Sequence, residues 1–293
     1  MPKTDPITFF KQSLKSDAYY ADEIINIYLL RPAAALIVWL LYPTRVTPNQ
    51  ITIAAIIVGL ISSFAYSSGS SQGIMIGGIL ILLKDILDDA DGQLARVKEM
   101  YSRRGRFLDS IGDVAVNFFV FGAITIILYH QNPSVITVLL GIASFFGITL
   151  RVSYHVFYQV SYLHLENRYK LNRLTEEITE DDLRGDRIAL RLQQIFNLIY
   201  GWQDRLMLSI DRWCQRGIVN NIDAGKWYGD RIGLRLSGLI GFGTEYMVLA
   251  ICSWADSLYF YLYINVFVMN GILFASILYR RFWLVRGEKI IKC

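Results

Sequence analysis

The sequence is poor in charge, cysteine and histidine. Asp, Glu, Lys and Arg together make up only 18% of its 293 residues, whereas a soluble domain carries about 25%. The chain has three cysteines and three histidines, too few for a disulfide framework or for a metal site built from Cys and His. The formal net charge of +4 is mild, so nothing predicts nucleic acid as a partner.

Apolar residues, at 54% of the chain, are gathered into uncharged runs that predict an all-α integral membrane protein. The run Gly73–Leu83 covers only about half of a bilayer at ~1.5 Å per residue, so we expect its helix to continue into the charged residues that follow. Six spans are predicted, and the helix of the first is expected to begin at Pro48. Their apolar runs are Ile51–Tyr66, Gly73–Leu83, Val114–Tyr129, Val135–Leu150, Leu236–Trp254 and Leu258–Tyr279.

The placement of basic residues predicts the orientation of these spans. The short loops 67–72, 130–134 and 255–257 contain no Lys or Arg, whereas the alternate loops are basic. Because Lys and Arg mark the cytoplasmic side, both termini are predicted to be cytoplasmic, which requires an even number of spans. The apolar stretch Pro32–Tyr42 is too short to cross, and we expect it to be a helix lying in the membrane interface.

Four segments follow from this pattern. Residues 1–46 are predicted to form cytoplasmic or interfacial helices, 47–152 spans one to four, 153–235 a cytoplasmic helical insert, and 236–293 spans five and six with a cytoplasmic tail. Within the insert, apolar residues recur every three to four positions from Ile188 to Trp213, which predicts an amphipathic helix. Its apolar stripe is expected to pack on the insert or on the membrane surface; the alternative is a homodimer contact.

Acidic residues gather at the predicted membrane end of one helix. Asp88 and Asp91 are three positions apart, and on the next span Asp109 and Asp113 are four apart, so each pair shares a helix face. The short basic loop Val97–Arg106 joins the two helices antiparallel, which lets the four carboxylates meet. Carboxylates brought together repel each other unless a cation lies between them, and oxygen ligands favour Mg²⁺ or Mn²⁺, with two ions expected.

The neighbouring residues suggest phosphate chemistry at this metal site. Gly92, Ala95 and Gly105 are small enough for a ligand to approach the backbone, and the loop is rich in arginines that pair with phosphate. Metals held by carboxylates commonly bridge phosphate oxygens and absorb the charge that develops as a phosphoryl group moves. The residues therefore predict phosphoryl or phosphodiester transfer at a membrane surface.

The spacing Asp88-x2-Asp91-Gly92-x2-Ala95-Arg96-x8-Gly105-x3-Asp109-x3-Asp113 resembles the motif of the CDP-alcohol phosphotransferases (CDP-alcohol phosphatidyltransferases). Thr47-Pro48-Asn49-Gln50-Ile51-Thr52 is similar to the start of that family's first span. The resemblance implies six spans and a cytoplasmic active site. It also implies transfer of a substituted phosphoryl group from a CDP-linked alcohol to an acceptor hydroxyl, with release of CMP, in phospholipid biosynthesis.

The resemblance also implies roles for individual residues. Asp88, Asp91 and Asp109 would bind the metals, and Asp113 would contact a metal and take the proton from the attacking hydroxyl. The residues that would surround the cytidine diphosphate are Pro48, Asn49, Gln50, Ile51, Gly92, Ala95, Arg96, Ser102 and Gly105.

The acceptor is less well defined by the sequence. Arg151, at the end of the fourth predicted span, would bind an acceptor phosphate or else extend to the interface. Glu245, inside the fifth, would contact an acceptor hydroxyl or else serve as a packing element. The family includes members with CDP-diacylglycerol and a polar acceptor, and members with a CDP-linked polar alcohol and a lipid acceptor. The lead-in Arg31-Pro32 is similar to members that use inositol phosphate.

A different function also places acids within spans. In an ion transporter, Asp88 and Asp113 would relay a cation. That hypothesis predicts neither the small residues beside the acids nor the arginine-rich loop, and the sequence contains no inverted repeat.

Overall fold

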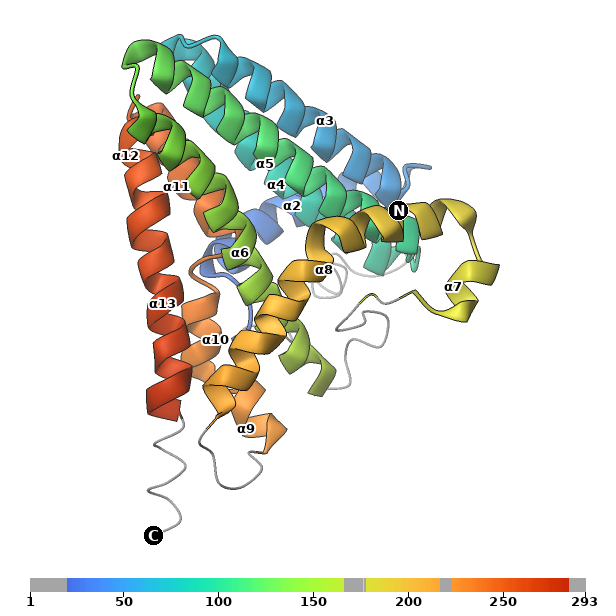
Figure 1. The fold of residues 1–293 in the computed structure, drawn as a ribbon. Helices are drawn as coiled ribbons and strands as arrows, with labels where there is room; N and C mark the ends of the chain where they lie inside the picture. The colour runs from blue at the N-terminus through green and yellow to red at the C-terminus, as the bar shows by residue number, and fades with distance from the viewer. Residues whose placement is uncertain (1–19, 166–175, 177, 217–222, 285–293) are drawn as a thin grey trace.

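The computed structural model describes residues 20–165, 176, 178–216 and 223–284, and within them every regular element is a helix (Figure 1). The predicted all-α class is confirmed for this part of the chain. Most of the predicted N-terminal helical segment, and the tail after residue 284, lie outside the described residues. The long helices are α2 (Arg31–Leu41), α3 (Pro48–Ser67), α4 (Ser71–Val97), α5 (Arg103–Gln131), α6 (Val135–Leu165), α8 (Arg187–Gln215) and α11 (Phe242–Trp254).

Shorter elements complete the fold. A π-helical turn, η2 (Asn26–Leu30), precedes α2, and α7 (Glu180–Arg184), α9 (Ala224–Tyr228) and α10 (Arg231–Ser237) flank α8 and α11. The final helix runs from Leu258 to Leu284. It consists of α12 (Leu258–Tyr263), η3 (Ile264–Met269), α13 (Asn270–Leu278) and η4 (Tyr279–Leu284), of which η3 and η4 are π-helical.

Helices α3, α4 and α5 lie side by side (Figure 1), and their starts follow local sequence signals. Pro48 occupies the first turn of α3, and the backbone N–H of Thr47 donates to Gln50 Oε1 at 2.9 Å, as a capping box does. Gly59 allows α3 and α5 to approach closely, since a Cβ there would lie 2.6 Å from a methyl group of Val116. As predicted, α4 continues without a break through its charged half.

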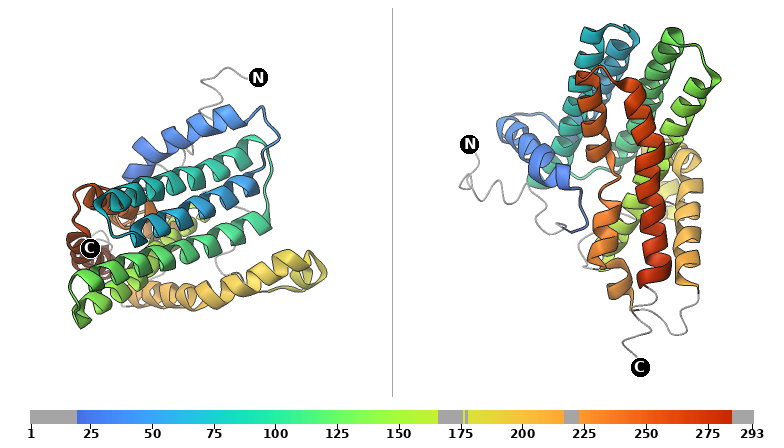
Figure 2. Two further views of the ribbon diagram at one scale, coloured as in Figure 1. Left: turned by 90° about the horizontal axis from the view of Figure 1, so that it is seen from above. Right: turned by 90° about the vertical axis from the view of Figure 1, so that its left-hand side faces the viewer.

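The apolar helix α2 and the amphipathic helix α8 flank the layer of α3, α4 and α5 on opposite sides. Figure 2 shows α2 beside α4 and the amphipathic helix α8 beside α5. The insert is joined to the bundle by Asp211 of α8, whose carboxylate accepts hydrogen bonds from Tyr158 of α6 at 2.9 Å and from Trp227 of α9 at 2.8 Å. The apolar stripe of α8 is partly exposed, with Ile188 54% and Ile195 44% accessible. The predicted homodimer contact through this stripe stays a prediction.

By length and composition, four helices could cross a membrane: α3, α5, α6 and Leu258–Leu284. A fifth candidate is the pair α10 and α11, which is bent by 41°. Among the described residues α4 does not meet the same criterion, although it is 27 residues long, since Lys84, Asp85 and Asp88 interrupt its apolar run. The structure thus supports an integral membrane protein with four or five apolar spans, and six spans are not confirmed. The interfacial position of α2 and the side of each terminus also remain predictions.

Candidate active site

Three of the four motif aspartates converge where α4 and α5 meet. One carboxylate oxygen from each of Asp88, Asp91 and Asp109 lies within 4.8 Å of the others. Oδ1 of Asp109 is buried and has no hydrogen-bond partner among the described residues. An oxygen-only donor set with an unpartnered, buried carboxylate oxygen fits a divalent cation such as Mg²⁺. These residues could therefore hold the predicted metal.

Asp113, the fourth motif residue, contacts a lysine. The ammonium group of Lys84, whose side chain is fully buried, forms an ion pair with Asp113 and a second with Asp88 Oδ2 at 3.2 Å. The sequence suggests the Lys84–Asp88 pair, because the two residues are one helical turn apart. It does not indicate the pair between α4 and α5. Lys84 is thus a residue of the site that sequence reasoning missed.

A cavity of about 330 Å³ opens on one side of the acids. Asp91 and Asp109 are among its lining residues. It is lined by seven of the nine residues predicted to surround cytidine diphosphate: Pro48 and Asn49 from α3, Gly92, Ala95 and Arg96 from α4, and Ser102 and Gly105 at the start of α5. A Cβ at Gly105 would overlap Asn49 Oδ1 of α3, so a larger residue there would have to displace that side chain.

Two residues predicted with this group do not line the cavity. Gln50 caps the start of α3 through Thr47, and Ile51 is buried against α4 near Ala90 and Leu94. Thr52 takes a place in the cavity instead and donates a hydrogen bond to Asp91. The sequence carries a signal for Thr52, which lies one turn after Pro48 and so faces the same way.

A second cavity, of about 360 Å³, lies on the other side of the acids between α5, α6 and α8. Asp88 and Asp113 line this cavity, and Asp109 and Arg106 line both cavities. Its outer wall comes from α8 through Phe196, Tyr200 and Asp204. Burial and the nearby carboxylate of Glu176 raise the pKa of Asp204 to about 6. Sequence reasoning did not place any α8 residue at the site.

The arginines of the basic loop are paired with carboxylates of the insert. Arg103 forms ion pairs with Asp182 and Glu176, Arg106 with Glu176, and Arg104 with Asp186. The Arg104 hydrogen bond lowers the pKa of the Asp186 carboxyl. These contacts tie the insert to the start of α5, beside the first cavity.

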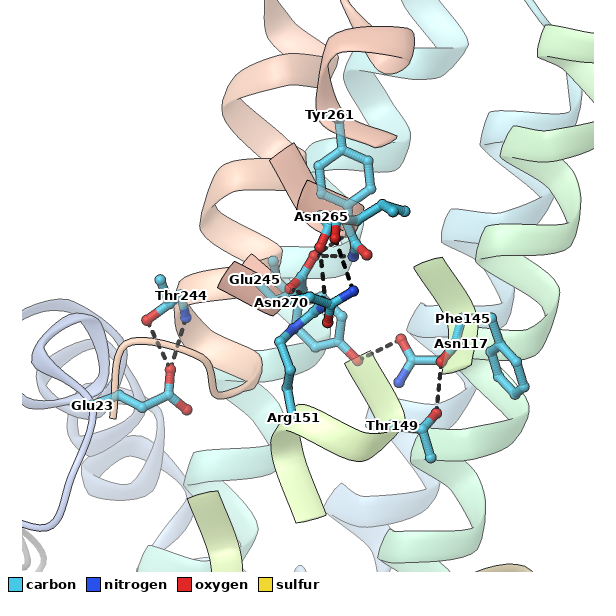
Figure 3. Close-up of polar contacts among 12 residues, drawn as sticks. Glu23, Asn117, Phe145, Thr149, Arg151, Thr244, Glu245, Tyr261, Asn265 and Asn270 are labelled. Atoms are coloured by element: carbon cyan, nitrogen blue, oxygen red, sulfur yellow. Dashed lines mark hydrogen bonds and ion pairs between the residues drawn. The ribbon is translucent and has the colours of Figure 1, made fainter. Parts of the chain in front are cut away.

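Arg151 and Glu245, each predicted as an acceptor ligand, are brought together by α6 and α11 (Figure 3). Arg151 Nη2 donates to Glu245 Oε2 at 2.6 Å, and both side chains are fully buried. Tyr261 donates to Glu245 Oε1 at 2.7 Å, and Arg151 Nη1 donates to Asn270 Oδ1 at 2.7 Å. Neither residue lines the two cavities just described. Their acceptor role stays a prediction, and the geometry is that of a buried ion pair.

Comparison with known proteins gives the family of this site. Residues 45–170 match the family model for CDP-alcohol phosphatidyltransferase. The chain is similar to a bifunctional IPC transferase and DIPP synthase of Archaeoglobus fulgidus, with 37% identity over 91 residues, or 31% of this chain and 18% of that protein. It is also similar to an archaetidylinositol phosphate synthase of Pyrococcus horikoshii, with 37% identity over 68 residues, or 23% of this chain and 35% of that protein.

A further relative is the bifunctional IPC transferase and DIPP synthase of Aquifex aeolicus, with 34% identity over 91 residues, or 31% of this chain and 19% of that protein. The matched segments therefore span less than a fifth of the bifunctional relatives and about a third of the synthase. The family model covers α3, α4, α5 and α6; among these, α4 and α5 supply the motif acids, and α3, α4 and α5 line the first cavity. The resemblance predicted from the aspartate spacing is confirmed over residues 45–170, which match the model of the CDP-alcohol phosphatidyltransferase family.

Proposed function

We propose that this protein transfers a substituted phosphoryl group from a CDP-linked alcohol to an acceptor hydroxyl and releases CMP. The observation that carries the proposal is the position of the motif acids between two cavities that share Asp109 and Arg106. A transfer between two bound substrates needs a reacting centre that both can reach. The cation-transport hypothesis does not account for the match to a transferase family.

The first cavity suits the nucleotide end of the donor. Gly92, Ala95 and Gly105 line it with small residues, so a ligand can come close to the backbone there. Arg96 supplies a guanidinium that can pair with phosphate. The hydroxyl of Thr52 donates to Asp91 and so fixes the orientation of that carboxylate. These residues bind and orient the donor with its diphosphate toward Asp91 and Asp109.

Asp88, Asp91 and Asp109 would hold one or two Mg²⁺ or Mn²⁺ ions, which when bound supply positive charge to the diphosphate oxygens and to the transferred group. Asp113 accepts the proton of the acceptor hydroxyl as general base. The acceptor oxygen forms a bond to the phosphorus that bears the donor's alcohol, and the bond from that phosphorus to the CMP oxygen breaks. The electron pair leaves with CMP, and the product is a phosphodiester.

The ion pair between Lys84 and Asp113 supports the assignment of the base. A neighbouring cation keeps a carboxylate ionised, and only the ionised form can take a proton. The same lysine contacts Asp88, so it also fixes the distance between the base and the metal ligands.

Inositol phosphate is a second candidate acceptor within the same reaction class. One relative carries the name archaetidylinositol phosphate synthase. We place the reaction in phospholipid biosynthesis at a membrane, with the site on the cytoplasmic side, because the basic loops lie at the same end of the predicted spans as the acids.

A CMP-release assay tests this function. The full chain in detergent is incubated with CDP-diacylglycerol or CDP-choline, each with several alcohols, in Mg²⁺, in Mn²⁺ and in EDTA. We expect CMP release that depends on both substrates and is lost in EDTA, and we expect Asp88→Asn and Asp91→Asn to lower both metal affinity and rate. Full turnover in chelator contradicts the metal assignment, and no release from any pair contradicts the function.

A further inference from the structure

The second cavity owes its outer wall to a helix outside the family domain. The family model ends at residue 170, whereas Phe196, Tyr200 and Asp204 belong to α8, within Arg187–Gln215. The same cavity is also lined by Asp88, Asp109 and Asp113. A helix beyond the segment that matches the family model therefore lines the same cavity as these acids.

Hydrogen bonds and ring contacts fix α8 at this position. The hydroxyl of Tyr200 donates to the backbone oxygen of Ser110 on α5 at 2.9 Å, and Ser153 of α6 donates to Gln203 at 2.5 Å. The ring of Phe196 contacts that of Phe107, with centroids 5.3 Å apart. The wall thus belongs to the folded bundle.

The charge of this wall is negative. Arg106 is the one Lys or Arg among the described residues that line the cavity, and it forms an ion pair with Glu176. Asp204 is half-buried, and no described residue donates a hydrogen bond to it or forms an ion pair with it. Since its pKa is raised only to about 6, it is ionised near pH 7.5. The rest of this wall is apolar, with Val156, Phe157 and Val160 from α6.

We propose that this cavity receives the acceptor and that Asp204 of α8 selects an alcohol without a phosphate group. This inference rests on the proposed function. A phosphorylated acceptor would bring its dianion against a carboxylate that no described residue pairs with, in a partly buried cavity, which opposes binding by like-charge repulsion. A neutral hydroxyl donates to Asp204, and an amine pairs with it, so both are compatible with the wall. Asp204 is thus a specificity residue, distinct from the acids that hold the metal.

The test compares matched acceptors that differ by one phosphate. The full chain in detergent receives CDP-diacylglycerol with glycerol or glycerol phosphate, and with inositol or inositol phosphate, since each phosphorylated member keeps a free hydroxyl. It also receives CDP-choline with monoacylglycerol or its phosphate. For each pair, kcat/KM is measured from CMP release. We expect the wild type to prefer the unphosphorylated member by at least ~10-fold, which is about 1.4 kcal/mol.

Substitutions at position 204 give the direction of the effect. Asp204→Lys is expected to shift the ratio of kcat/KM toward the phosphorylated acceptor by at least ~10-fold, and Asp204→Asn by less, with donor KM unchanged in both. Asn has nearly the size of Asp and keeps the test valid if the lysine variant folds poorly. Arg205→Ala is the matched control, because Arg205 is exposed on the same helix and does not line the cavity; its ratio should equal that of the wild type.

The outcomes separate the inference from the function it rests on. Release of CMP with a wild-type preference for the phosphorylated acceptors, or with a ratio that the Asp204 variants leave unchanged, overturns the inference and leaves the proposed function standing. A shift in the Arg205 variant as large as that in the Asp204 variants also overturns it, because the effect would then be one of general surface charge. No release from any pair contradicts the proposed function and the inference together.

Discussion

Lys84 is the residue on which the electrostatics of the site depend. Its ammonium group is completely buried and forms ion pairs with carboxylates of two helices, Asp88 on α4 and Asp113 on α5. A buried cation is strongly unfavourable unless it is paired, so these contacts account for its position in an apolar helix. The pairs also set Asp113 apart from the three acids that converge on one point, Asp88, Asp91 and Asp109.

The separation of Asp113 from that group predicts a separable defect. Asp113→Asn keeps the size of the side chain and can still accept a hydrogen bond from Lys84, but it cannot take a proton from the acceptor. We expect it to bind the CDP-linked donor as the wild type does and to lose at least ~10²-fold in rate, the low end for one acid–base group. Donor affinity and single-turnover CMP release measure the two effects.

Asp85→Asn is a suitable control for this experiment. Asp85 is a buried acid of the same region that belongs neither to the motif nor to the lining of either cavity. It should retain rate and donor affinity within a few-fold. If the Asn variant at position 113 turns over normally, the base lies elsewhere; if its donor binding is lost, Asp113 acts chiefly as a metal ligand.

At the scale of helices, the first cavity depends on how closely α3 and α5 approach. Both helices begin beside it, α3 with Thr47 and Pro48 and α5 with Ser102, whose hydroxyl accepts from the backbone N–H of Gly105 at 3.2 Å. A side chain at position 105 would overlap Asn49. The absence of a Cβ therefore keeps Asn49 at the edge of the cavity.

Gly105→Ala is expected to displace Asn49 and narrow the donor cavity. Alanine is a better helix former than glycine, so α5 itself should not be weakened. We expect affinity for CDP to fall by about 10-fold, which is about 1.4 kcal/mol, as measured by isothermal titration in Mg²⁺. Gly122→Ala on the same helix is the control, because a Cβ there meets nothing within 4 Å. Equal CDP affinity in both variants would contradict this reading of the packing.

Another contact between elements links the segment before α2 to the start of α11. Glu23 is almost fully buried and accepts hydrogen bonds from the backbone N–H and hydroxyl of Thr244 at 2.8 and 3.0 Å (Figure 3). Burial is the main cause that raises the pKa of Glu23 to about 7 from its ordinary value of 4.5. The hydrogen bonds from Thr244 act in the opposite direction.

This raised pKa predicts how stability changes with pH. Between pH 4.5 and about 7 the folded protein holds the Glu23 proton and the unfolded chain does not, so this residue makes the protein less stable as the pH rises through that window. Glu23→Gln does not titrate. The difference in unfolding temperature, wild type minus variant, should therefore be larger at pH 5 than at pH 8. A difference that is constant with pH, measured by thermal unfolding in detergent, would contradict the assignment.

At the scale of the whole molecule, sequence and structure agree where the determinants are local. The spacing of the aspartates placed them on facing helix turns, and Thr47 and Pro48 marked the start of α3, because both signals act within one or two turns. Contacts between distant segments were not predictable from the sequence. Arg151 and Glu245 were interpreted separately, yet α6 and α11 bring them together. The wall formed by α8 likewise depends on Tyr200 reaching Ser110, 90 positions away.

The orientation of the molecule in the membrane is the last prediction. Lys and Arg are absent from the short loops, such as 130–134, and abundant in the alternate ones, so the insert and the site are expected on the cytoplasmic side. Single cysteines at Glu180, in the insert, and at Asn132, between α5 and α6, would test this, since both positions are exposed. Cys214 and Cys252 are buried, and Cys293→Ser removes the remaining cysteine.

In intact cells, a membrane-impermeant maleimide should label the Asn132→Cys variant and not the Glu180→Cys variant. In inverted vesicles the pattern should reverse, because the vesicle interior then corresponds to the outside of the cell. Labelling of both positions from the same side would exclude an odd number of crossings between them. Labelling of the insert from outside would move the acids and both cavities to the opposite face, since α8 forms one wall of the site.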